Sequence, residues 1–438
     1  METTALPARG IEPLHRAFRA SVCPPGSKSE TNRFYMLGAL ASGATRVLRP
    51  LRADDPDHFA LGLTLTGCPV QLDEAGATIL GSAGRPAGGV AVDMGEGGTP
   101  TRFFMALGAL SRRGVVVDGS ERMRQRPVDE LARMLVALGA DVSFTEAPGR
   151  LPVRVGARRV RGGSISVGAT ASSQFISAVL LAGPWMEDGV DIIFTQPPTS
   201  ASYIELTIDA LRRFGATVEV LRDGAGRLAR ITVPAALLEG RTVTVEPDAS
   251  SAVYFLAAAA LIRDARCAVP GLPRATKQPD GAVVAALVAM GANDITVPGG
   301  TCVEGTGTLR GVDLDGSRWP DGALCVAAVA AAARGVTRIR GLQTLRVKES
   351  NRIVALAEEL RKLGCTVQTT DSSIEIDPST AHGRAVEIET HNDHRVAMSF
   401  AVLGLARPGI TIANPGCVSK SYPGFWDDLA SLRAGAST

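Results

Sequence analysis

The chain has 438 residues, 45% of them hydrophobic and 21% charged, which is enough apolar material for well-buried cores. Such a length predicts at least two domains, because one hydrophobic core stops growing at roughly 250–300 residues. Lys and Arg number 46 against 44 Asp and Glu, and the resulting net charge of +2 argues against a nucleic-acid partner.

No apolar stretch is long enough to span a bilayer, the longest being 252–262 and 323–333, so no membrane partner is expected. The N-terminus also lacks the apolar core of a signal peptide. Seven cysteines stand singly, without a C-x-x-C pair, which is typical of buried thiols in a reducing compartment. We therefore expect a cytoplasmic protein without a metal site.

Six helices are predicted in chain order, each opened by a polar cluster and continued by an Ala- and Leu-rich run. They occupy 27–43, 98–114, 169–184, 248–264, 320–335 and 392–409. Each run is apolar on nearly every side, so these helices are expected to be buried inside the domains. Their N-termini present unpaired N–H groups and can attract anions.

A second pattern recurs between these helices: an apolar helix end, a glycine, and a short run with strand-like alternation. Each glycine fits the position just after a helix, where the left-handed conformation costs a residue without Cβ little. The glycines are Gly67, Gly139, Gly215, Gly291 and Gly364, separated by 72, 76, 76 and 73 residues, with a truncated sixth copy ending at Gly435.

The two patterns together predict an α/β protein of six similar units, each with two helices and several short strands. The economical arrangement is two similar domains of three units, with the buried helices packed inside sheets. A chance recurrence of helix, glycine and strand would not keep so constant a period.

Cationic and hydroxyl side chains gather at the predicted helix starts and in nearby loops, and as a group they favour a substrate with several phosphates or carboxylates. Singly, each arginine is also explained by surface solvation. The residues are Lys28, Ser29, Arg33, Thr99, Arg102, Arg122, Arg124, Arg126, Ser172, Ser173, Arg346, Lys348, Arg352, Arg395 and Lys420.

Three acidic positions are open to two interpretations each. Asp321 fits either an N-cap or a catalytic carboxylate. Glu349 lies within one turn of two cations, so it is either a plain salt-bridge partner or a general acid or base. Asp393 likewise fits a cap beside a satisfied histidine. No phosphate-loop, dinucleotide or hydrolase motif occurs, although GSKS at 26–29 resembles part of a phosphate loop.

Seven motifs stand in an order and spacing that resemble the enolpyruvyl transferases, and among them the branch that uses shikimate 3-phosphate. The resemblance covers essentially the whole chain. The motifs are PPGSKSETNR (24–33), GEGGTPTR (95–102), RQRP (124–127), SSQF (172–175), RVKESNR (346–352), NDHR (392–395) and SKSYPGF (419–425).

The resemblance implies two domains, each a threefold repeat of a βαβαββ unit, with the active-site cleft between them. It places one domain at 26–246, mostly acceptor-binding, and a second, discontinuous domain at 1–25 plus 247–438. It also implies a monomer that joins phosphoenolpyruvate to the 5-hydroxyl of shikimate 3-phosphate by addition and elimination, releasing phosphate. No cofactor is implied, since fixed cations can stabilise the developing charge.

Site residues follow from the same resemblance, matched motif by motif. The catalytic residues would be Lys28, Asp321 and Glu349. Phosphoenolpyruvate would contact Lys28, Gly98, Arg126, Gln174, Arg352, Arg395 and Lys420. Shikimate 3-phosphate would contact Lys28, Ser29, Arg33, Ser172, Ser173, Gln174, Ser200, Tyr203, Asp321 and Lys348.

Departures from the family pattern keep other acceptors open. Glu96 and Gly97 replace the usual Asn-Ala, and Thr344 stands where many members have an Asn that touches the shikimate ring. An enolpyruvyl transferase acting on another hydroxyl, such as that of a nucleotide, and a non-catalytic anion-binding relative are the alternatives. The sister enzyme for UDP-N-acetylglucosamine is disfavoured, because 111–127 contains no cysteine. Retention of Gly98 predicts sensitivity to glyphosate.

Overall fold

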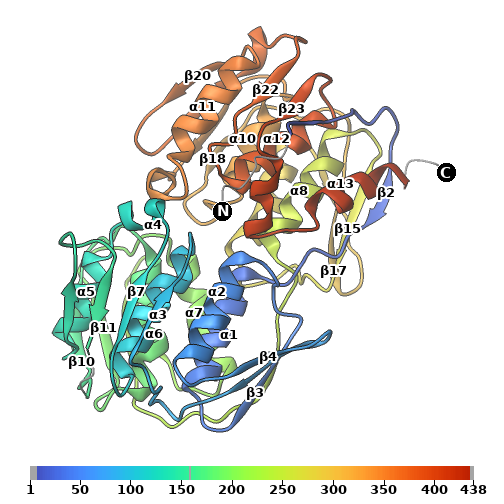
Figure 1. The fold of residues 1–438 in the computed structure, drawn as a ribbon. Coiled ribbons are helices and arrows are strands. Elements are labelled where there is room, and N and C mark those ends of the chain that lie inside the picture. Colours follow the sequence, from blue (N-terminus) through green and yellow to red (C-terminus); the bar gives the residue numbers. More distant parts are fainter. Residues whose placement is uncertain (1–6, 157–158, 435–438) are drawn as a thin grey trace. The chain divides into compact units, whose positions relative to one another are not determined.

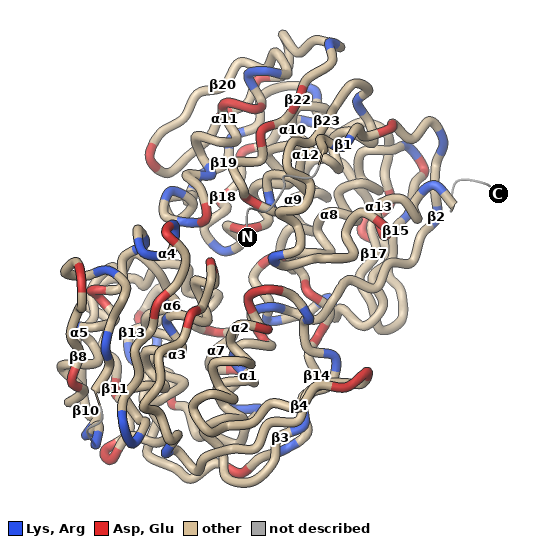
Figure 2. The backbone as a smooth tube through the Cα atoms, in the orientation of Figure 1, with Lys and Arg blue, Asp and Glu red and all other residues tan. Residues whose placement is uncertain are grey.

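In the computed structural model, which describes residues 7–156 and 159–434, the chain divides into two compact units. One is Gly26–Glu246, called here the continuous unit. The other, called the split unit, combines Met1–Pro25 with Pro247–Thr438. Each is an assembly of short sheets and helices (Figure 1). Figure 2 shows acidic and basic residues interspersed along both.

Each unit holds three copies of one βαβαββ pattern, and each copy forms its own small sheet. The first two strands of each copy run parallel. In four copies the first helix joins them directly, whereas in the first copy of each unit the first strand comes from a distant part of the chain. In the five copies that form four-stranded sheets, the fourth strand lies antiparallel to the second and the third occupies the edge. The third copy of the split unit forms a three-stranded sheet among the described residues. The predicted fold class, two similar α/β domains with threefold repeats, is confirmed.

The continuous unit contains three four-stranded sheets. Its first copy consists of β14 (Thr242–Thr244), α1 (Lys28–Leu40), β3 (Ala44–Leu48), α2 (Asp54–Leu65), β4 (Val70–Leu72) and β5 (Gly76–Leu80). The second consists of β6 (Val90–Asp93), α3 (Gly98–Leu110), β7 (Val115–Asp118), α4 (Glu121–Gln125), α5 (Asp129–Ala137), β8 (Val142–Phe144) and β9 (Val153–Val155). The third consists of β10 (Gly163–Val167), α6 (Ser173–Ala182), η1 (Gly183–Trp185), β11 (Val190–Phe194), α7 (Ala201–Arg213), β12 (Glu219–Arg222) and β13 (Leu228–Val233).

The split unit repeats the pattern, with two strands supplied by the N-terminal segment. Its first copy consists of β2 (Arg19–Ser21), α8 (Ala249–Leu261), β15 (Arg266–Pro270), η2 (Pro279–Ala282), α9 (Val283–Met290), β16 (Asn293–Asp294) and β17 (Gly300–Glu304). The second consists of β18 (Asp313–Asp315), α10 (Ala323–Ala330), β19 (Thr337–Arg340), η3 (Gln343–Val347), α11 (Arg352–Lys362), β20 (Thr366–Thr369), β21 (Ile374–Asp377) and η4 (Pro378–Thr380). The third consists of β22 (Val386–Ile388), α12 (His394–Gly404), β23 (Ile410–Ile412), η5 (Pro415–Lys420), α13 (Phe425–Ala434) and β1 (Arg9–Gly10).

The first helix of every copy is buried along almost its whole length, as predicted from its apolar faces. In the continuous unit α1, α3 and α6 pack against one another, and in the split unit α8, α10 and α12 do the same. Each trio lies in the centre of its own hydrophobic core. This packing brings the N-termini of three helices together within each unit.

The five helix-end glycines all have positive φ, between +85° and +117°. Gly291 is the left-handed C-cap of α9 and shows the predicted geometry in full. The prediction made from the repeat period is therefore confirmed at these positions. Gly435, the sixth, lies outside the described residues. Cys23 is exposed, so the prediction that the thiols are buried was wrong there.

Candidate active site

Asp321 is the point at which three cationic side chains of the split unit meet. Its carboxylate lies 2.9 Å from Arg352 Nη1, 3.2 Å from Lys348 Nζ and 3.2 Å from Arg395 Nη2. The carboxylate belongs to the loop just before α10, and Arg395 belongs to the first turn of α12. The packing of α10 beside α12 therefore joins two motifs that are far apart in the sequence.

Arg352 is the most enclosed of these cations, with 1% of its side chain exposed. Asp393 accepts from its Nε at 2.7 Å and from its Nη2 at 3.1 Å. Asp393 also caps α12 by accepting from the backbone N–H of Arg395 at 3.0 Å. It is therefore a cap, as one interpretation held, and also an anchor that fixes a guanidinium.

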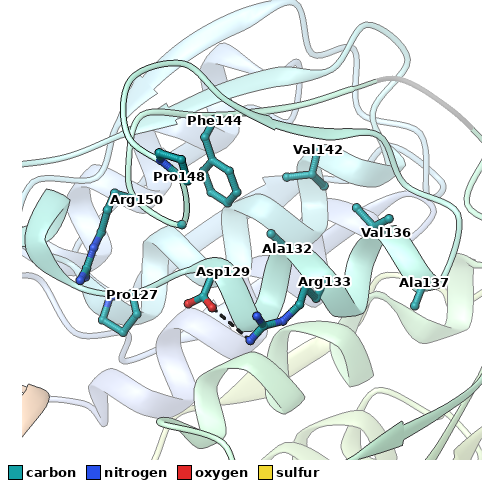
Figure 3. A pocket seen from close by; sticks show the side chains of 11 residues that line it. Pro127, Asp129, Ala132, Arg133, Val136, Ala137, Val142, Phe144, Pro148 and Arg150 are labelled. Carbon is teal, nitrogen blue, oxygen red and sulfur yellow. Dashed lines mark ion pairs between the residues drawn. The ribbon is translucent and has the colours of Figure 1, made fainter.

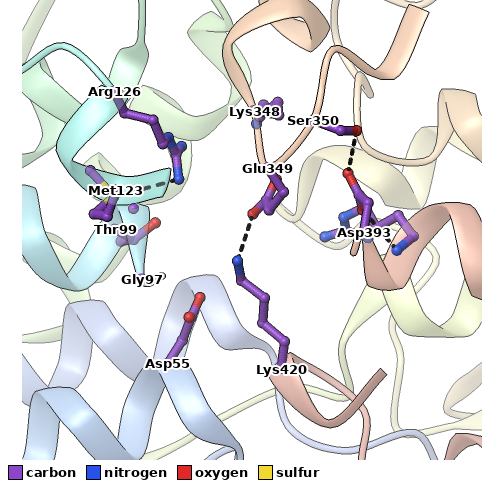
Figure 4. Close-up of polar contacts among 12 residues, drawn as sticks. Asp55, Gly97, Thr99, Met123, Arg126, Lys348, Glu349, Ser350, Asp393 and Lys420 are labelled. Carbon is purple, nitrogen blue, oxygen red and sulfur yellow. Dashed lines mark hydrogen bonds and ion pairs between the residues drawn. The ribbon is translucent and has the colours of Figure 1, made fainter. Parts of the chain in front are cut away.

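Glu349 bridges two cations, lying 2.9 Å from Arg352 Nη2 and 3.6 Å from Lys420 Nζ (Figure 4). It lies with Lys348 in the bend before α11, which begins at Arg352 and is capped by Asn351. Placing these residues outside the helix lets the Glu349 carboxylate reach η5, which carries Lys420. The salt-bridge interpretation is thus correct, and a proton-transfer role is compatible with it.

The charges in this cluster shift one another's pKa. Burial raises the pKa of Asp321, but the charges of Arg395, Lys348 and Arg352 outweigh it and hold the pKa well below its usual range. Burial lowers the pKa of Arg352, and the carboxylates of Asp393, Glu349 and Asp321 raise it further than burial lowers it. The cluster combines four cations with three carboxylates. It therefore keeps a positive excess suited to an anionic ligand.

The structure also decides the question of the Asp321 cap. The N-cap of α10 is Gly322, one residue later, which has no side chain to make a capping hydrogen bond. Asp321 is therefore not the cap of this helix, and its carboxylate is directed to cations.

In the continuous unit, Lys28 is the first residue of α1 and lies 3.1 Å from Asp55 of α2. Sequence reasoning missed Asp55, although a run of acidic residues at the start of α2 was visible. Ser27 caps α1 by accepting from the backbone N–H of Glu30. The cation is thus held at a helix N-terminus with a buried carboxylate beside it.

Arg33 is buried deeper in the same helix, with 3% of the residue exposed. Its guanidinium donates to the Thr207 hydroxyl, the Ser177 hydroxyl and the backbone oxygens of Ser29 and Tyr203. These bonds connect α1 to α6 and α7, so Arg33 has a structural role in addition to the predicted contact with the acceptor carboxylate.

Gly98 opens α3 against the side chain of Arg126. A Cβ at this position would lie 2.6 Å from Arg126 Nη1 and 2.7 Å from Nη2, closer than any real contact. Arg102 supports the same corner by donating to the backbone oxygens of Gly98 and Pro127. Figure 4 shows Arg126 extending from the α4 end beside Met123.

The hydroxyl residues cluster at the starts of α6 and α7. Ser172 caps α6, and Gln174 in its first turn donates to the Thr99 hydroxyl at 3.2 Å. Ser200 precedes α7 in the left-handed conformation, with φ of +49°. Ser173 and Tyr203 lie in the first turns of the same two helices.

The remaining predicted cations contact groups at the surface instead, and among them Arg122 donates to the side-chain oxygen of Gln125. Arg124 binds Asp118 and Glu146, and Arg346 binds Asp371. Of the two family departures, Glu96 is half-buried in the turn before α3. The Thr344 hydroxyl is buried in η3 and has no hydrogen-bond partner among the described residues.

A separate hollow of about 750 Å³ lies over α5 and β8 of the continuous unit (Figure 3). Its lining is mostly apolar, with an ion pair of 3.0 Å between Asp129 and Arg133. No predicted site residue lines it. Among the described residues, no group of acidic, His or Cys side chains is arranged to hold a metal, and no helix is long and apolar enough to cross a bilayer.

Comparison with known proteins agrees with this geometry. A family model for EPSP synthase (3-phosphoshikimate 1-carboxyvinyltransferase) matches residues 15–429. The chain belongs to this family. A 3-phosphoshikimate 1-carboxyvinyltransferase of Methanoculleus marisnigri is 42% identical over 419 residues, covering 95% of this chain and 96% of the relative. One from Aliivibrio fischeri is 35% identical over 93% of this chain and 95% of its own.

Solved structures give the same result. An EPSP synthase from Acinetobacter baumannii superposes with a TM-score of 0.79 at 29% identity, covering 98% of each chain. The enolpyruvyl transferase NikO from Streptomyces tendae shares the fold, with a TM-score of 0.73 at 19% identity over 97% of each chain. The predicted enolpyruvyl transferase family and its 3-phosphoshikimate branch are confirmed, and the protein is a transferase.

Proposed function

We propose that this protein transfers the carboxyvinyl group of phosphoenolpyruvate to the 5-hydroxyl of shikimate 3-phosphate. The observation that carries the proposal is the Asp321 cluster, in which one ionised carboxylate is surrounded by Lys348, Arg352 and Arg395. Such a cluster combines a proton acceptor with cations for phosphate and carboxylate groups.

In the proposed reaction, Asp321 accepts the proton of the 5-hydroxyl group. At the same time the oxygen of that hydroxyl forms a bond to C2 of phosphoenolpyruvate. The methylene carbon gains a proton from Glu349 or Lys28, giving a tetrahedral intermediate. Loss of a proton from the same carbon then breaks the bond between C2 and the phosphate oxygen, and inorganic phosphate leaves. The anionic substrates would bind the same cations that surround Asp321. Their negative charge would offset the cations that hold the pKa of Asp321 low, so the pKa would rise and Asp321 would become a stronger base.

The binding roles are proposed for the residues carried by the family motifs. Phosphoenolpyruvate is assigned to Lys28, Gly98, Arg126, Gln174, Arg352, Arg395 and Lys420. Shikimate 3-phosphate is assigned to Lys28, Ser29, Arg33, Ser172, Ser173, Gln174, Ser200, Tyr203, Asp321 and Lys348. The Thr344 hydroxyl has no hydrogen-bond partner among the described residues, which supports an additional contact with the acceptor in place of the Asn common in the family. Residues 26–246 would bind mainly the acceptor.

The test is phosphate release from phosphoenolpyruvate with shikimate 3-phosphate as acceptor, beside a control without acceptor and one with a uridine nucleotide. Acceptor-dependent release with shikimate 3-phosphate is expected. Release only with the nucleotide would contradict the acceptor and favour the alternative transferase. Absence of release with every acceptor, while phosphoenolpyruvate still binds, would favour a non-catalytic relative.

Two finer properties are part of the proposal. Glyphosate is expected to inhibit, because the chain retains Gly98 of the family motif, where a Cβ would displace the guanidinium of Arg126. Unchanged turnover at millimolar glyphosate would contradict this. A cytoplasmic monomer is also proposed, since each helix trio is enclosed within its own unit and both substrates are phosphorylated metabolites. Light scattering at working concentration tests the monomer.

A further inference from the structure

The three buried helices of the split unit do not begin in the same way. Asp248 caps α8 by accepting from the backbone N–H of Ser251 at 2.7 Å. Asp393 caps α12 in the same manner. Only α10, which follows Asp321, receives no capping bond from the residue at its N-cap. The repeat thus makes α10 the exception among three equivalent helices.

The missing acceptor comes from a different element. Asp280, in η2, accepts from the backbone N–H of Gly322 at 3.0 Å. Its second oxygen accepts from the hydroxyl of Ser250, in the first turn of α8. The side chain is buried, with 2% of the residue exposed. One carboxylate therefore connects the starts of α8 and α10.

Local packing explains why the cap cannot come from Gly322 itself. A Cβ at Gly322 would lie 2.5 Å from Val283 Cγ2 and 3.3 Å from Asp280 Oδ1. Position 322 therefore has no space for a capping side chain. Asp280, which lies outside α10, accepts from the Gly322 N–H at the start of this helix. The Asp321 carboxylate is therefore not needed as a cap and contacts its three cations.

The pKa values of the Asp280 and Asp321 carboxylates are shifted in opposite directions. Burial, and then the charge of Asp321, raise the pKa of Asp280 to about 6 against the lowering effect of Arg395. Asp321 has its pKa held low by cations. Two neighbouring carboxylates whose pKa values are moved apart are typical of a division of roles.

We propose that Asp280 is a positioning residue, which fixes the first turn of α10 through the Gly322 N–H and thereby holds Asp321 against Lys348, Arg352 and Arg395. The inference rests on the proposed role of Asp321 as the base. Asp280 is assigned no contact with either substrate. Besides its charge interaction with Arg395, its effect on the reaction comes through the position of Asp321.

The test compares Asp280→Ala with Asp280→Asn. Alanine leaves the Gly322 N–H without an acceptor, whereas the Asn amide oxygen can accept it and the amide nitrogen can donate to Ser250. We expect kcat for Asp280→Ala to fall about tenfold or more, with KM for phosphoenolpyruvate changed less than about threefold. The acid limb of its pH profile should move to higher pH, because Asp321 loses cation contacts. Asp280→Asn should retain most of kcat.

Thr306→Val is the matched control, since the Thr306 hydroxyl donates to the Gly291 backbone oxygen at 2.9 Å, at the other end of α9. It should lower stability to urea without moving kcat or the pH profile. Equal kcat loss in Thr306→Val and Asp280→Ala would overturn the proposal, as would an Asp280→Ala enzyme with a wild-type pH profile. Loss of activity in Asp280→Asn equal to that in Asp280→Ala would also overturn it.

Hydrogen exchange at 320–326 gives a readout that needs no turnover. In the unliganded protein, Asp280→Ala should speed exchange in this segment about tenfold, while Asp280→Asn and Thr306→Val should not. If the wild type fails to use shikimate 3-phosphate, the proposed function falls and hydrogen exchange still decides whether Asp280 fixes α10. Unchanged exchange in Asp280→Ala would refute the positioning role whatever the acceptor.

Discussion

Because Gly98 has no Cβ atom, the guanidinium of Arg126 can lie directly against the start of α3. Gly98→Ala would place a methyl group 2.6 Å from the guanidinium and displace it. We expect KM for phosphoenolpyruvate to rise about tenfold, because a cation assigned to this substrate moves by roughly an ångström. KM for shikimate 3-phosphate should change much less. Steady-state kinetics with each substrate varied in turn measure both.

Gly168→Ala is the control for this substitution. A Cβ at Gly168 would meet only the Thr195 hydroxyl, at an ordinary contact of 3.6 Å, and its φ is not positive. Normal kinetics are expected. If Gly98→Ala also behaved normally, Arg126 would not be a phosphoenolpyruvate ligand.

Glu349 offers a second residue-level prediction, because its carboxylate bridges Arg352 and Lys420. Glu349→Gln keeps the shape and removes the proton-carrying group. We expect kcat to fall by about 10²–10⁴, the usual contribution of a general acid or base, with a smaller change in KM. Incorporation of solvent deuterium into the methylene of phosphoenolpyruvate should fall in parallel. A variant that still exchanged deuterium at the wild-type rate would remove Glu349 from the proton transfer.

At the scale of the element, the helix-end glycines fix where each second helix stops. Gly291 has φ of +117° at the C-cap of α9, a conformation that is costly for a residue with a Cβ. Gly291→Ala is expected to lower the free energy of unfolding by about 1–2 kcal/mol. Gly383→Ala, at an open position without positive φ, should have little effect. Urea unfolding of the two variants compares them, and equal midpoints would contradict the assignment.

The elements were predictable where the signal was local. An apolar helix buried on all sides, such as α8, is recognised from its own residues. A glycine in the left-handed conformation just after a helix is also recognised from the neighbouring residues. The start of α10 was not predictable to one residue, because its cap comes from Asp280, 42 residues earlier in the sequence. A single-residue shift of that start decided whether Asp321 was a cap or a ligand of cations.

At the scale of the whole molecule, the two places where the chain passes between units are hydrogen-bonded locally. Ser27 N–H donates to the Glu246 backbone oxygen, and Glu246 N–H donates to the buried carboxylate of Glu30, both at 2.8 Å. Glu30 also receives a bond from Arg213 of α7. Burial raises the pKa of Glu30 to about 7, against the lowering effects of the Glu246 N–H and Arg213.

A raised carboxyl pKa makes the native state bind more protons than the unfolded chain between about pH 4.5 and 7. Stability should therefore fall as pH rises through this window, and Glu30→Gln should lack this component. From pH 5 to pH 8 we expect the wild type to lose about 2 kcal/mol relative to Glu30→Gln in urea unfolding. Glu205→Gln, at an exposed ion pair on α7, is the control. If the difference in free energy of unfolding between wild type and Glu30→Gln were the same at pH 5 and pH 8, the argument that burial raises the pKa of Glu30 would be contradicted.

The charge pairing of the molecule was the part that the sequence could not specify. The sequence identified the cationic residues as a group. The pairing of Lys28 with Asp55 and the two hydrogen bonds from Arg352 to Asp393 depend on which helices pack together. Arg124 and Arg346 look the same in sequence and instead pair with carboxylates at the surface. Local patterns identify residue types, whereas their partners are set by the tertiary packing.

The N-terminal segment contributes β1 and β2 to two different sheets of the split unit, beside β23 and β15. During synthesis the strand β2 leaves the ribosome roughly 250 residues before β15, a wait on the order of ten seconds or more at ordinary elongation rates. All strands of the continuous unit emerge within that interval. Co-translational folding should therefore complete the continuous unit first, while β2 stays unpaired until β15 emerges and β1 until β23 emerges.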